Sequence, residues 1–271
     1  MPPLPSPTVL VFDSGLGGLT VFREVAAARP DARLVYAADD AFFPYGAQGE
    51  AELVGRVVPL MGDLIARFAP DLVVIACNTA STLVLPQLRA RYEVPFVGTV
   101  PAIKPACAAS TSKRVSVLGT EATVKREYTR ALIRDFSQGC DVTLVGSAVL
   151  ASIAEAALRA EPVDEAAIAA EIAPCFIDDG ARRTDTVVLA CTHYPLLLDR
   201  LARLAPWRVA WVDPAPAIAR RVVDLLGPPR DRPEGGPEAV ALFSAARPAS
   251  RALMATLSGF GIKAIAEAPA V

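Results

Sequence analysis

Short apolar runs rich in Val, Ile and Leu alternate along the chain with Ala, Arg and Leu stretches of helical period. Runs of this length bounded by turn residues are typical of buried strands. The pattern predicts eight strands, at residues 9–12, 33–37, 71–76, 94–98, 115–119, 142–146, 185–190 and 209–213. Because strands that alternate with helices form parallel sheets covered on both faces, we expect an α/β fold.

An internal repeat divides this pattern into two halves. Residues 71–79, Asp-Leu-Val-Val-Ile-Ala-Cys-Asn-Thr, align with residues 185–193, Asp-Thr-Val-Val-Leu-Ala-Cys-Thr-His, with five identities in nine positions. A second match, Pro-Ala-Ile at 101–103 and at 216–218, follows in the same order. The repeat predicts a duplication, with two pseudo-symmetric α/β domains of four strands each and mostly parallel sheets.

The Pro-Ala-Ile segments follow the fourth predicted strand of each half, so we expect the chain to cross between the domains there. The first domain is predicted to comprise residues 1–99 and 213–271, and the second residues 100–212. The Pro-rich start, residues 1–7, is predicted to be a short disordered tail, and the Pro/Gly/Glu-rich stretch 228–237 an exposed excursion.

Composition and charge exclude several classes of protein. The chain has 271 residues, 53% of them apolar, but no apolar run approaches the ~20 residues of a membrane-spanning helix. Its start has neither the basic region nor the apolar stretch of a secretory signal. With 27 basic and 29 acidic residues and no basic run, binding to nucleic acid or an anionic membrane is disfavoured. We expect a small-molecule partner.

Cysteine and histidine usage narrows the chemistry. The five cysteines are odd in number and widely spaced, and they form no C-x-x-C pair. A disulfide framework or zinc ribbon is therefore disfavoured, and a reducing cytoplasm is the expected setting. The single histidine, His193, excludes mechanisms that need two imidazoles, including most catalytic metal sites.

Cys77 and Cys191 stand apart because each ends a buried strand and precedes polar residues. Both segments resemble helix starts: Asn78 or Thr79 can cap the first, and Pro195 suits the first position of the second. The N–H groups of a helix N-terminus lower the pKa of a thiol, so both cysteines are candidates for proton transfer. The other three are expected to be inert packing or surface thiols: Cys107, Cys140 and Cys175.

Two equivalent thiols suit the inversion of a carbon that bears a weakly acidic hydrogen. Inversion needs a base on one face and an acid on the other, and the two exchange roles when the direction reverses. Hydroxyl and amide groups at the strand ends would bind the carboxylates of a substrate, and Asp13 would receive an ammonium group or orient a thiol. The candidate binding residues are Ser14, Asn78, Thr79, Thr120, Thr123 and Thr192.

Five segments together resemble the glutamate racemase family. They are Asp-Ser-Gly-Leu-Gly-Gly-Leu-Thr-Val at 13–21, Pro-Tyr-Gly at 44–46, Cys-Asn-Thr-Ala-Ser at 77–81, Gly-Thr-x-x-Thr at 119–123 and Cys-Thr-His-Tyr-Pro-Leu-Leu at 191–197. The likeness runs from about residue 9 to about residue 260. It implies racemisation of glutamate without a cofactor or metal, supplying D-glutamate for peptidoglycan, in a two-domain fold with the active site in the cleft between the domains. It leaves a homodimer open.

The resemblance also implies roles for individual residues. Cys77 would be the base toward D-glutamate and Cys191 the base toward L-glutamate, while Asp13 and His193 would tune the thiols. Pro44, Tyr45 and Gly46 would join the candidate binding residues, to which His193 also belongs.

Two segments depart from the family pattern. The family usually has Cys-Pro and Pro-Leu-Val-Glu around an auxiliary glutamate, whereas residues 146–155 read Gly-Ser-Ala-Val-Leu-Ala-Ser-Ile-Ala-Glu. Glu155 stays in register and is carried over as a catalytic residue, with a solvated helix charge as the alternative. Asp39 keeps its place although Tyr-Ala-Ala-Asp replaces the usual Tyr-x-Gly-Asp, and its alternative is a turn residue. For His193 the alternative is a satisfied polar group beside a helix.

Other functions remain open at this point. The Gly-rich segment 15–18 could belong to a dinucleotide site, although it lacks the third spaced glycine and begins beside a carboxylate that would repel a pyrophosphate. A Cys/His hydrolase, a zinc site built from both thiols with His193 and Asp13, and a non-catalytic glutamate-binding module are further alternatives. An aspartate racemase would share the chemistry and differ in pocket length.

Overall fold

The computed structural model describes residues 6–231, 239–245 and 250–266. Most of the predicted disordered tail, and the 232–237 part of the predicted excursion, lie outside these residues. The chain divides into two compact units, which comprise residues 1–99 with 215–271 and residues 100–214. The chain thus returns to the first unit at Ala215, beside the return predicted at 213.

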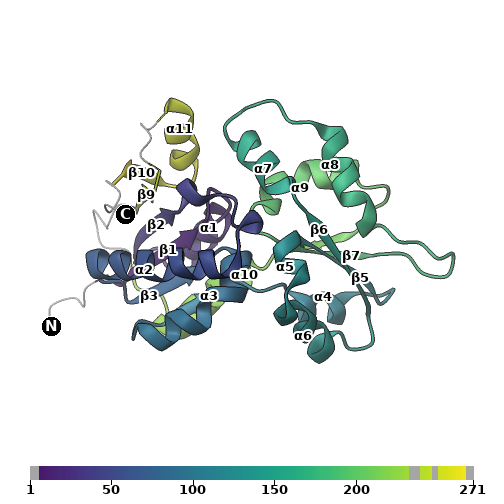
Figure 1. The fold of residues 1–271 in the computed structure, drawn as a ribbon, viewed down its shortest axis with the longest axis horizontal. Coiled ribbons are helices and arrows are strands. Elements are labelled where there is room, and N and C mark those ends of the chain that lie inside the picture. Colours follow the sequence, from purple (N-terminus) through teal and green to yellow (C-terminus); the bar gives the residue numbers. More distant parts are fainter. Residues whose placement is uncertain (1–5, 232–238, 246–249, 267–271) are drawn as a thin grey trace. The chain divides into compact units, whose positions relative to one another are not determined.

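A parallel sheet forms the centre of the first unit (Figure 1). Its strands are β1 (Thr8–Asp13), β2 (Arg33–Ala38), β3 (Leu72–Ile75), β4 (Phe96–Gly98), β9 (Ala239–Phe243) and β10 (Ile262–Ile265). Its helices are α1 (Leu19–Ala28), α2 (Glu50–Phe68), α3 (Asn78–Arg91), α10 (Ala215–Leu226) and α11 (Arg251–Gly259), with 3₁₀ turns η1 (Asp40–Phe42) and η2 (Tyr45–Ala47). The strand order is β10-β9-β2-β1-β3-β4, and neighbouring strands are parallel throughout.

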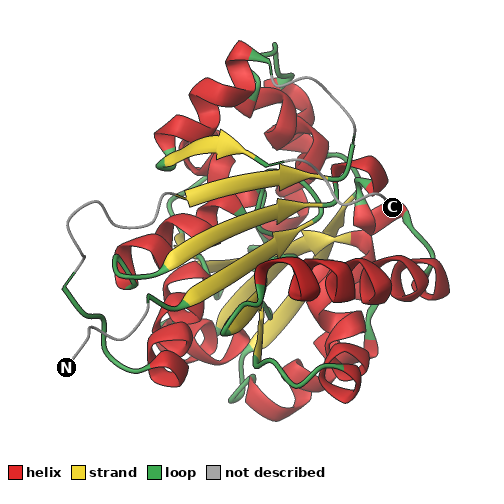
Figure 2. Cartoon of the chain, turned by 90° about the vertical axis from the view of Figure 1, so that its left-hand side faces the viewer, coloured by secondary structure: helices red, strands yellow, loops and turns green. Residues whose placement is uncertain are grey.

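Both faces of this sheet are covered, so β1 and β3 are buried along their whole length. Helix α2 places Leu53, Val57 and Leu64 on one stripe at helical spacing and packs it, with α3, against one face. On the other face, Phe22 of α1 packs edge-on against Tyr36 of β2 at a centroid distance of 5.9 Å, and α10 packs beside α1. Figure 2 shows these strands as yellow arrows between red helices.

The second unit repeats this architecture with fewer strands. Its strands are β5 (Arg114–Thr120), β6 (Asp141–Ser147), β7 (Thr186–Ala190) and β8 (Ala210–Val212). Its helices are α4 (Ile103–Ala109), α5 (Glu121–Lys125), α6 (Glu127–Phe136), α7 (Leu150–Leu158), α8 (Glu165–Ile172) and α9 (Leu198–Leu204), with 3₁₀ turns η3 (Ala173–Cys175) and η4 (Tyr194–Leu197). The parallel order β6-β5-β7-β8 reproduces β2-β1-β3-β4 of the first unit.

The predicted α/β fold of two similar halves is therefore confirmed, and all eight predicted strands are present. The prediction of four strands in each half is wrong for the first unit. There the C-terminal return adds β9 and β10 beside β2.

The Pro-Ala-Ile segments mark where the chain changes unit. After β4, helix α4 packs on α6, β5 and β7 of the second unit. After β8, helix α10 packs on α1 and β4 of the first. Ile103 and Ile218 are buried in these equivalent helices, which explains why the motif recurs after each fourth strand.

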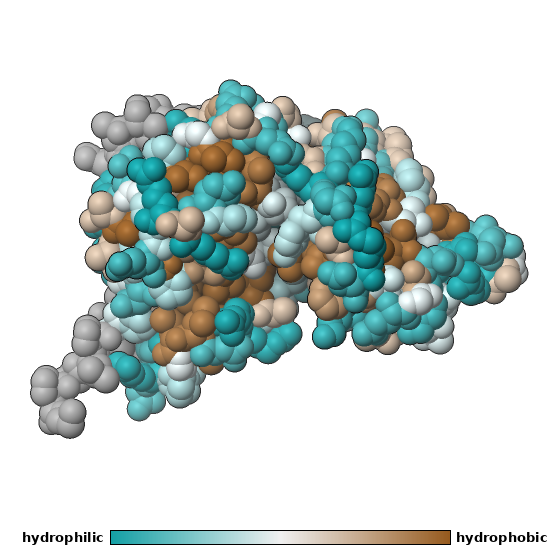
Figure 3. All heavy atoms as spheres, turned by 60° about the horizontal axis from the view of Figure 1, so that its bottom comes forward, coloured by the Kyte–Doolittle hydropathy of each residue, from teal (hydrophilic) through white to brown (hydrophobic). Residues whose placement is uncertain are grey.

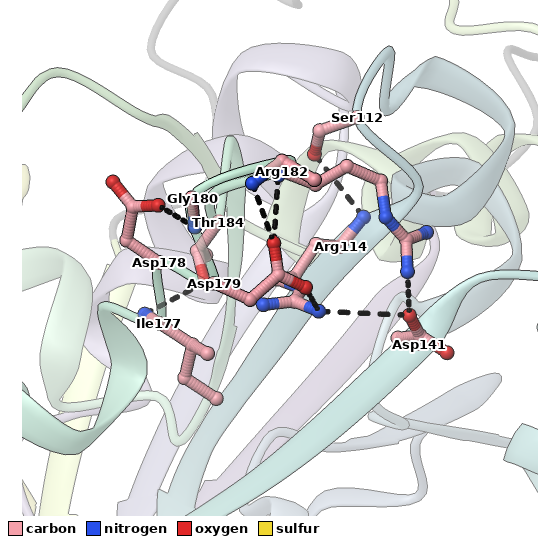
Figure 4. Close-up of polar contacts among 10 residues, drawn as sticks. Ser112, Arg114, Asp141, Ile177, Asp178, Asp179, Gly180, Arg182 and Thr184 are labelled. Atoms are coloured by element: carbon pink, nitrogen blue, oxygen red, sulfur yellow. Dashed lines mark hydrogen bonds and ion pairs between the residues drawn. The ribbon is translucent and has the colours of Figure 1, made fainter.

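An ion-pair network closes the amino ends of β5 and β6, at the edge of the sheet opposite Thr120 (Figure 4). Arg114 donates to the Asp179 carboxylate, and Arg182 donates to Asp141 at 2.6 Å. Asp179 also accepts the backbone N–H of Arg182 at 2.8 Å. The network fastens the 178–183 turn to the sheet, so its charges belong to the structure of this unit.

The surface carries both hydrophobic and hydrophilic side chains. Figure 3 shows brown hydrophobic patches among teal hydrophilic residues on the face that it draws. Within the described residues, the exposed large apolar side chains come from separate elements, and they are Tyr128, Val149, Leu198 and Leu225. No described helix is long and apolar enough to cross a membrane. The homodimer stays a prediction.

Candidate active site

Cys77 lies where β3 gives way to α3. It is the residue before the helix, its carbonyl accepts the N–H of Ser81 at 2.9 Å, and its side chain is only 6% exposed. Its Sγ lies 3.8 Å from Oγ of Ser14, which follows the adjacent strand β1. The thiol therefore faces the positive end of the α3 dipole, where negative charge on sulfur is favoured.

Asp13, the last residue of β1, is held next to this position. It is fully buried, and its Oδ2 accepts the backbone N–H groups of Gly15 and Gly18, each at 3.1 Å. A Cβ at Gly18 would lie 2.6 Å from the Asp13 Cβ, closer than two such atoms can approach. The Gly-rich segment after β1 is thus required for the backbone to wrap around this carboxylate.

Asn78 and Thr79 are the first two residues of α3, and both are buried. The prediction that one of them caps the helix is wrong, because the capping position is occupied by Cys77. The Asn78 side chain is 2% exposed, and neither its Nδ2 nor its Oδ1 has a hydrogen-bond partner among the described residues. A buried amide with both groups unsatisfied is costly, so this side chain points to a polar ligand.

The Pro-Tyr-Gly segment lies in the same unit, in the connection from β2 to α2. A cis peptide bond joins Phe43 to Pro44, and Tyr45 opens the turn η2, which packs against α3. Tyr45 is buried, and Cys77 belongs to the same core cluster. Gly46 follows within the turn.

Cys191 directly follows β7 in the second unit, just as Cys77 follows β3 in the first. Its Sγ lies 3.8 Å from Nδ1 of His193, and Nε2 of His193 lies 3.0 Å from Oε1 of Glu155 on α7. His193 is 2% exposed and Glu155 is buried. The alternative of a solvated helix charge is therefore wrong for Glu155, while the alternative of a satisfied polar group stays open for His193. Thiol, imidazole and carboxylate form one chain of contacts.

The predicted helix start after Cys191 also needs correction. Residues 194–197 form the 3₁₀ turn η4, with Pro195 as its second residue, and the α-helix begins only at Leu198. Thr192, which lies between Cys191 and His193 in the sequence, is also buried.

Thr120 is the last residue of the neighbouring strand β5, and Thr123 lies in α5, which follows it. The Thr120 Oγ1 accepts the N–H of Thr123 at 3.1 Å and lies 2.9 Å from the Thr123 hydroxyl oxygen. Thr120 thereby caps α5, which explains the Gly-Thr-x-x-Thr spacing by helix capping. It also puts both hydroxyls at the carboxyl edge of the sheet, where ligands of parallel sheets bind.

The comparisons with known proteins identify the family. A family model described as Asp/Glu/hydantoin racemase matches residues 19–222. The chain belongs to this family. Two relatives are named glutamate racemase: that of Brucella ovis is 55% identical over 260 residues, which cover 96% of this chain and 94% of the relative, and that of Brucella anthropi is 60% identical over 223 residues, which cover 82% and 80%.

Solved structures of racemases share the fold. The glutamate racemase of Escherichia coli, described in complex with L-glutamate and the activator UDP-MurNAc-Ala, superposes with a TM-score of 0.89 at 40% identity, covering 98% of this chain and 100% of that one. That of Thermus thermophilus gives 0.73 at 29% identity, covering 97% of each chain. The predicted resemblance to the glutamate racemase family, and the prediction of an enzyme of the isomerase class, are confirmed.

The remaining thiols of this racemase family member are buried in its core. Burial and the neighbouring Cys140 raise the pKa of Cys107 to about 12, and burial raises the pKa of Cys175 to about 12. Cys140 is buried as well, with its Sγ 3.4 Å from the Cys107 carbonyl oxygen. Of the two expectations for these cysteines, packing is confirmed and a surface position is wrong.

Sequence reasoning kept Asp39 in place but missed the contacts that its carboxylate makes. Asp39 is fully buried and accepts hydrogen bonds from Arg56 of α2 and from Tyr45. Asp39 is also a turn residue, as its alternative predicted, because it precedes η1 and its carbonyl accepts the N–H of Phe42 at 3.1 Å. The one signal in the sequence is an arginine between the buried positions Leu53 and Val57 of an amphipathic helix.

No three His, Cys, Asp or Glu side chains within the described ranges are arranged as a metal-binding group. In the chain of Cys191, His193 and Glu155, His193 directs one ring nitrogen toward the thiol and the other toward the carboxylate.

Proposed function

We propose that this protein interconverts L- and D-glutamate by a two-base mechanism carried by Cys77 and Cys191. The observation that carries the proposal is the equivalence of the two thiols. Each follows the carboxyl end of the third strand of its half, β3 or β7. The four strands β2-β1-β3-β4 and the four strands β6-β5-β7-β8 have the same order and are all parallel. Buried core cysteines seldom recur at matched, polar strand ends.

The reaction moves one proton at each face of the α-carbon. Starting from L-glutamate, the Cys191 thiolate takes the α-hydrogen and becomes a thiol, leaving a carbanion. The Cys77 thiol then gives its proton to the opposite face and becomes a thiolate, which is the base for the reverse reaction. Protons balance, no electrons are transferred, and no cofactor or metal is needed.

The auxiliary groups differ between the two thiols. The Asp13 carboxyl group lies at the end of β1, the strand next to β3, where it would receive the substrate ammonium group or orient the thiol. His193, held by Glu155, would exchange a proton with Cys191. Asn78 and the N-terminus of α3 are suited to bind a substrate carboxylate. The proposed substrate-binding groups also include Ser14, Pro44, Tyr45, Gly46, Thr79, Thr120, Thr123, Thr192 and His193.

We further propose that the product is D-glutamate for peptidoglycan and that the enzyme works in the cytoplasm. The support is the identity of 55% with the Brucella ovis protein named glutamate racemase and the absence of a disulfide framework.

The test begins with the purified protein after exhaustive chelation, incubated separately with each enantiomer of glutamate and of aspartate while optical rotation is followed. Rotation should decay to zero from either glutamate enantiomer only. Turnover of aspartate alone would identify an aspartate racemase, and activity restored only by zinc would identify a metal mechanism. A covalent acyl-enzyme would indicate a hydrolase, and binding without α-hydrogen exchange a binding module.

Racemisation in heavy water tests the two-base step. The D-glutamate formed from L-glutamate should carry deuterium at the α-carbon, while unreacted L-glutamate sampled early should stay largely protiated. Cys77→Ser and Cys191→Ser should each stop inversion, because a hydroxyl is a far weaker acid and poorer base than a thiol with a pKa of ~8.5. Equal early labelling of both pools would show a single shuttling base instead.

A further inference from the structure

Arg56 makes a two-point contact with Asp39 at the start of the Pro-Tyr-Gly connection. Its Nη2 donates to Oδ1 at 2.8 Å and its Nε to Oδ2 at 3.2 Å. The Arg56 side chain is 23% exposed and the Asp39 carboxylate is fully buried. A paired guanidinium of this geometry fixes both the position and the orientation of a carboxylate.

Asp39 in turn fixes Tyr45. The Tyr45 hydroxyl donates to Oδ2 of Asp39 at 2.7 Å. Burial raises the pKa of Tyr45 well above its ordinary value, and the charges of Asp39, Cys77 and Asp13 raise it further. The phenol therefore stays neutral, with its proton committed to Asp39, and it lies within electrostatic reach of the Cys77 thiol.

The C-terminal return closes the same connection from another side. Ser244, directly after β9, donates its N–H to the Ala38 carbonyl at 2.9 Å and accepts the N–H of Ala41 at 3.0 Å through its Oγ. Ala245 donates to Asp40 at 2.8 Å. Residues 38–41 are thus held between α2 on one side and the end of β9 on the other.

We propose that Arg56 is a positioning residue, which acts through Asp39 to fix the Tyr45 hydroxyl and the Pro-Tyr-Gly connection beside Cys77. This inference rests on the proposed glutamate racemisation. It assigns a function to a residue of α2 that belongs to none of the strand-end motifs. Arg56 itself touches no reacting atom in this arrangement.

The effect should fall on binding. Because the Tyr45 hydroxyl donates its proton to Asp39, we expect this connection to position the substrate and to take no part in proton transfer, so loss of its support should change KM and leave kcat nearly constant. Loss of Arg56 leaves Asp39 buried without its guanidinium, so the carboxylate and Tyr45 would shift toward water or toward other donors.

The test compares Arg56→Met, Arg56→Lys and Arg23→Met. Arg23 is the matched control because it is a surface arginine of the same unit, 59% exposed and 3.6 Å from Glu24. Arg56→Met should raise KM for both glutamate enantiomers on the order of tenfold, with kcat changed less than about threefold. Arg56→Lys should restore part of the loss, and Arg23→Met should match the wild type.

A second readout does not depend on substrate. Amide hydrogen exchange of residues 39–48 should be faster in Arg56→Met than in the wild type, while exchange in β5 and β7 stays unchanged. In a double-mutant cycle, the effects of Arg56→Met and Tyr45→Phe on KM should be non-additive, since each removes a hydrogen bond to the same carboxylate, Asp39.

The outcomes separate this inference from the proposed function. A wild type that racemises neither glutamate enantiomer overturns the proposed function. Amide exchange of residues 39–48 then still tests whether Arg56 positions this connection through Asp39. A wild type that racemises glutamate, with Arg56→Met equal to it in KM and in loop exchange, overturns the inference alone. A fall in kcat with constant KM also overturns it, since Arg56 would then act on proton transfer.

Discussion

The two thiols share one backbone setting and have different neighbours. Cys77 and Cys191 both follow the third strand of a sheet of order 2-1-3-4. Beside Cys77, the Asp13 carboxylate accepts two backbone N–H groups from the segment after β1. Beside Cys191, a side-chain imidazole contacts the sulfur and is itself held by Glu155 from α7.

This difference shows which features of the candidate site are repeated in the two halves and which are not. The repeated strands place a sulfur at equivalent sheet edges, while the auxiliary groups come from segments that are not equivalent in the two halves. At the Asp13 position of β1, the repeat has Gly119 in β5, which has no carboxylate. Symmetry of the fold therefore does not imply symmetry of the two proton transfers.

Thermodynamics limits where the asymmetry can appear. The two enantiomers of glutamate have equal free energies in water, so kcat/KM in the two directions must be equal for any variant. An auxiliary group can change kcat/KM only equally in both directions, and within that limit it can change how the barrier is divided between the two proton-transfer steps. Isotope effects measured separately for each enantiomer report that division.

The largest expected effect comes from removing the auxiliary groups themselves. Asp13→Asn and His193→Asn should each lower turnover by roughly a hundredfold or more, and weaken substrate binding less, because the proposed mechanism has both residues act on proton transfer in the transition state. Asp13→Asn should enlarge the primary isotope effect with α-deuterated D-glutamate, whose α-hydrogen goes to Cys77. His193→Asn should do so with α-deuterated L-glutamate.

Steady-state rates with each deuterated enantiomer make this measurement. If His193→Asn leaves both directions at wild-type turnover, His193 serves structure only. Equal isotope effects for the two enantiomers in both variants would break the assignment of one auxiliary group to each thiol.

A smaller effect is expected from Gly18→Ala, which moves the Asp13 carboxylate without removing it. The added Cβ would lie 2.6 Å from the Asp13 Cβ, so the carboxylate or the segment after β1 must shift. We expect a loss of ~1–3 kcal/mol of stability, as for overpacking elsewhere, and a fall in turnover of at least about tenfold.

Gly55→Ala in the interior of α2 is the matched control. No atom lies within 4 Å of a Cβ added there, so alanine should stabilise the protein by ~0.5–1 kcal/mol with unchanged turnover. Thermal unfolding and kcat, measured on Gly18→Ala and Gly55→Ala, test these two expectations. A fully active Gly18→Ala enzyme would show that the position of Asp13 is not critical.

The sequence predicts the strands and the crossing points well because both depend on local patterns. Eight apolar runs became eight strands, and the Pro-Ala-Ile helices proved to be the crossing helices. β9 escaped prediction because its five residues follow a stretch rich in Pro and Gly, and nothing local shows that they pair with β2. Pairing between strands so far apart in the sequence is determined by tertiary packing and leaves no local pattern.

In the candidate site, the sequence indicates the residues at strand ends but not the contacts that helices bring to them. Cys77 and Cys191 follow from the repeat, Asp13 from its place at a strand end, and Glu155 from the family pattern. The contact of Glu155 with His193 depends on how α7 packs on η4, which no spacing encodes. Arg56 reaches Asp39 from α2 in the same way.

The smallest expected effect concerns the arginine of the Cys191 half. Arg159 donates to Glu155 Oε2 at 3.1 Å, but its side chain is 43% exposed and it also binds Glu161 at 2.7 Å. An ion pair so open to solvent contributes ~0–1 kcal/mol. Arg159→Met should therefore change KM and kcat less than about threefold, well below the effect of Arg56→Met on KM, because His193 still holds Glu155 from its other oxygen. Parallel kinetics on the two variants measure the contrast, with the unfolding free energy as a check on folding. If Arg159→Met impaired the enzyme as much as Arg56→Met, both halves would depend on an arginine that positions a carboxylate. The two halves would then differ only in the groups that contact the sulfur.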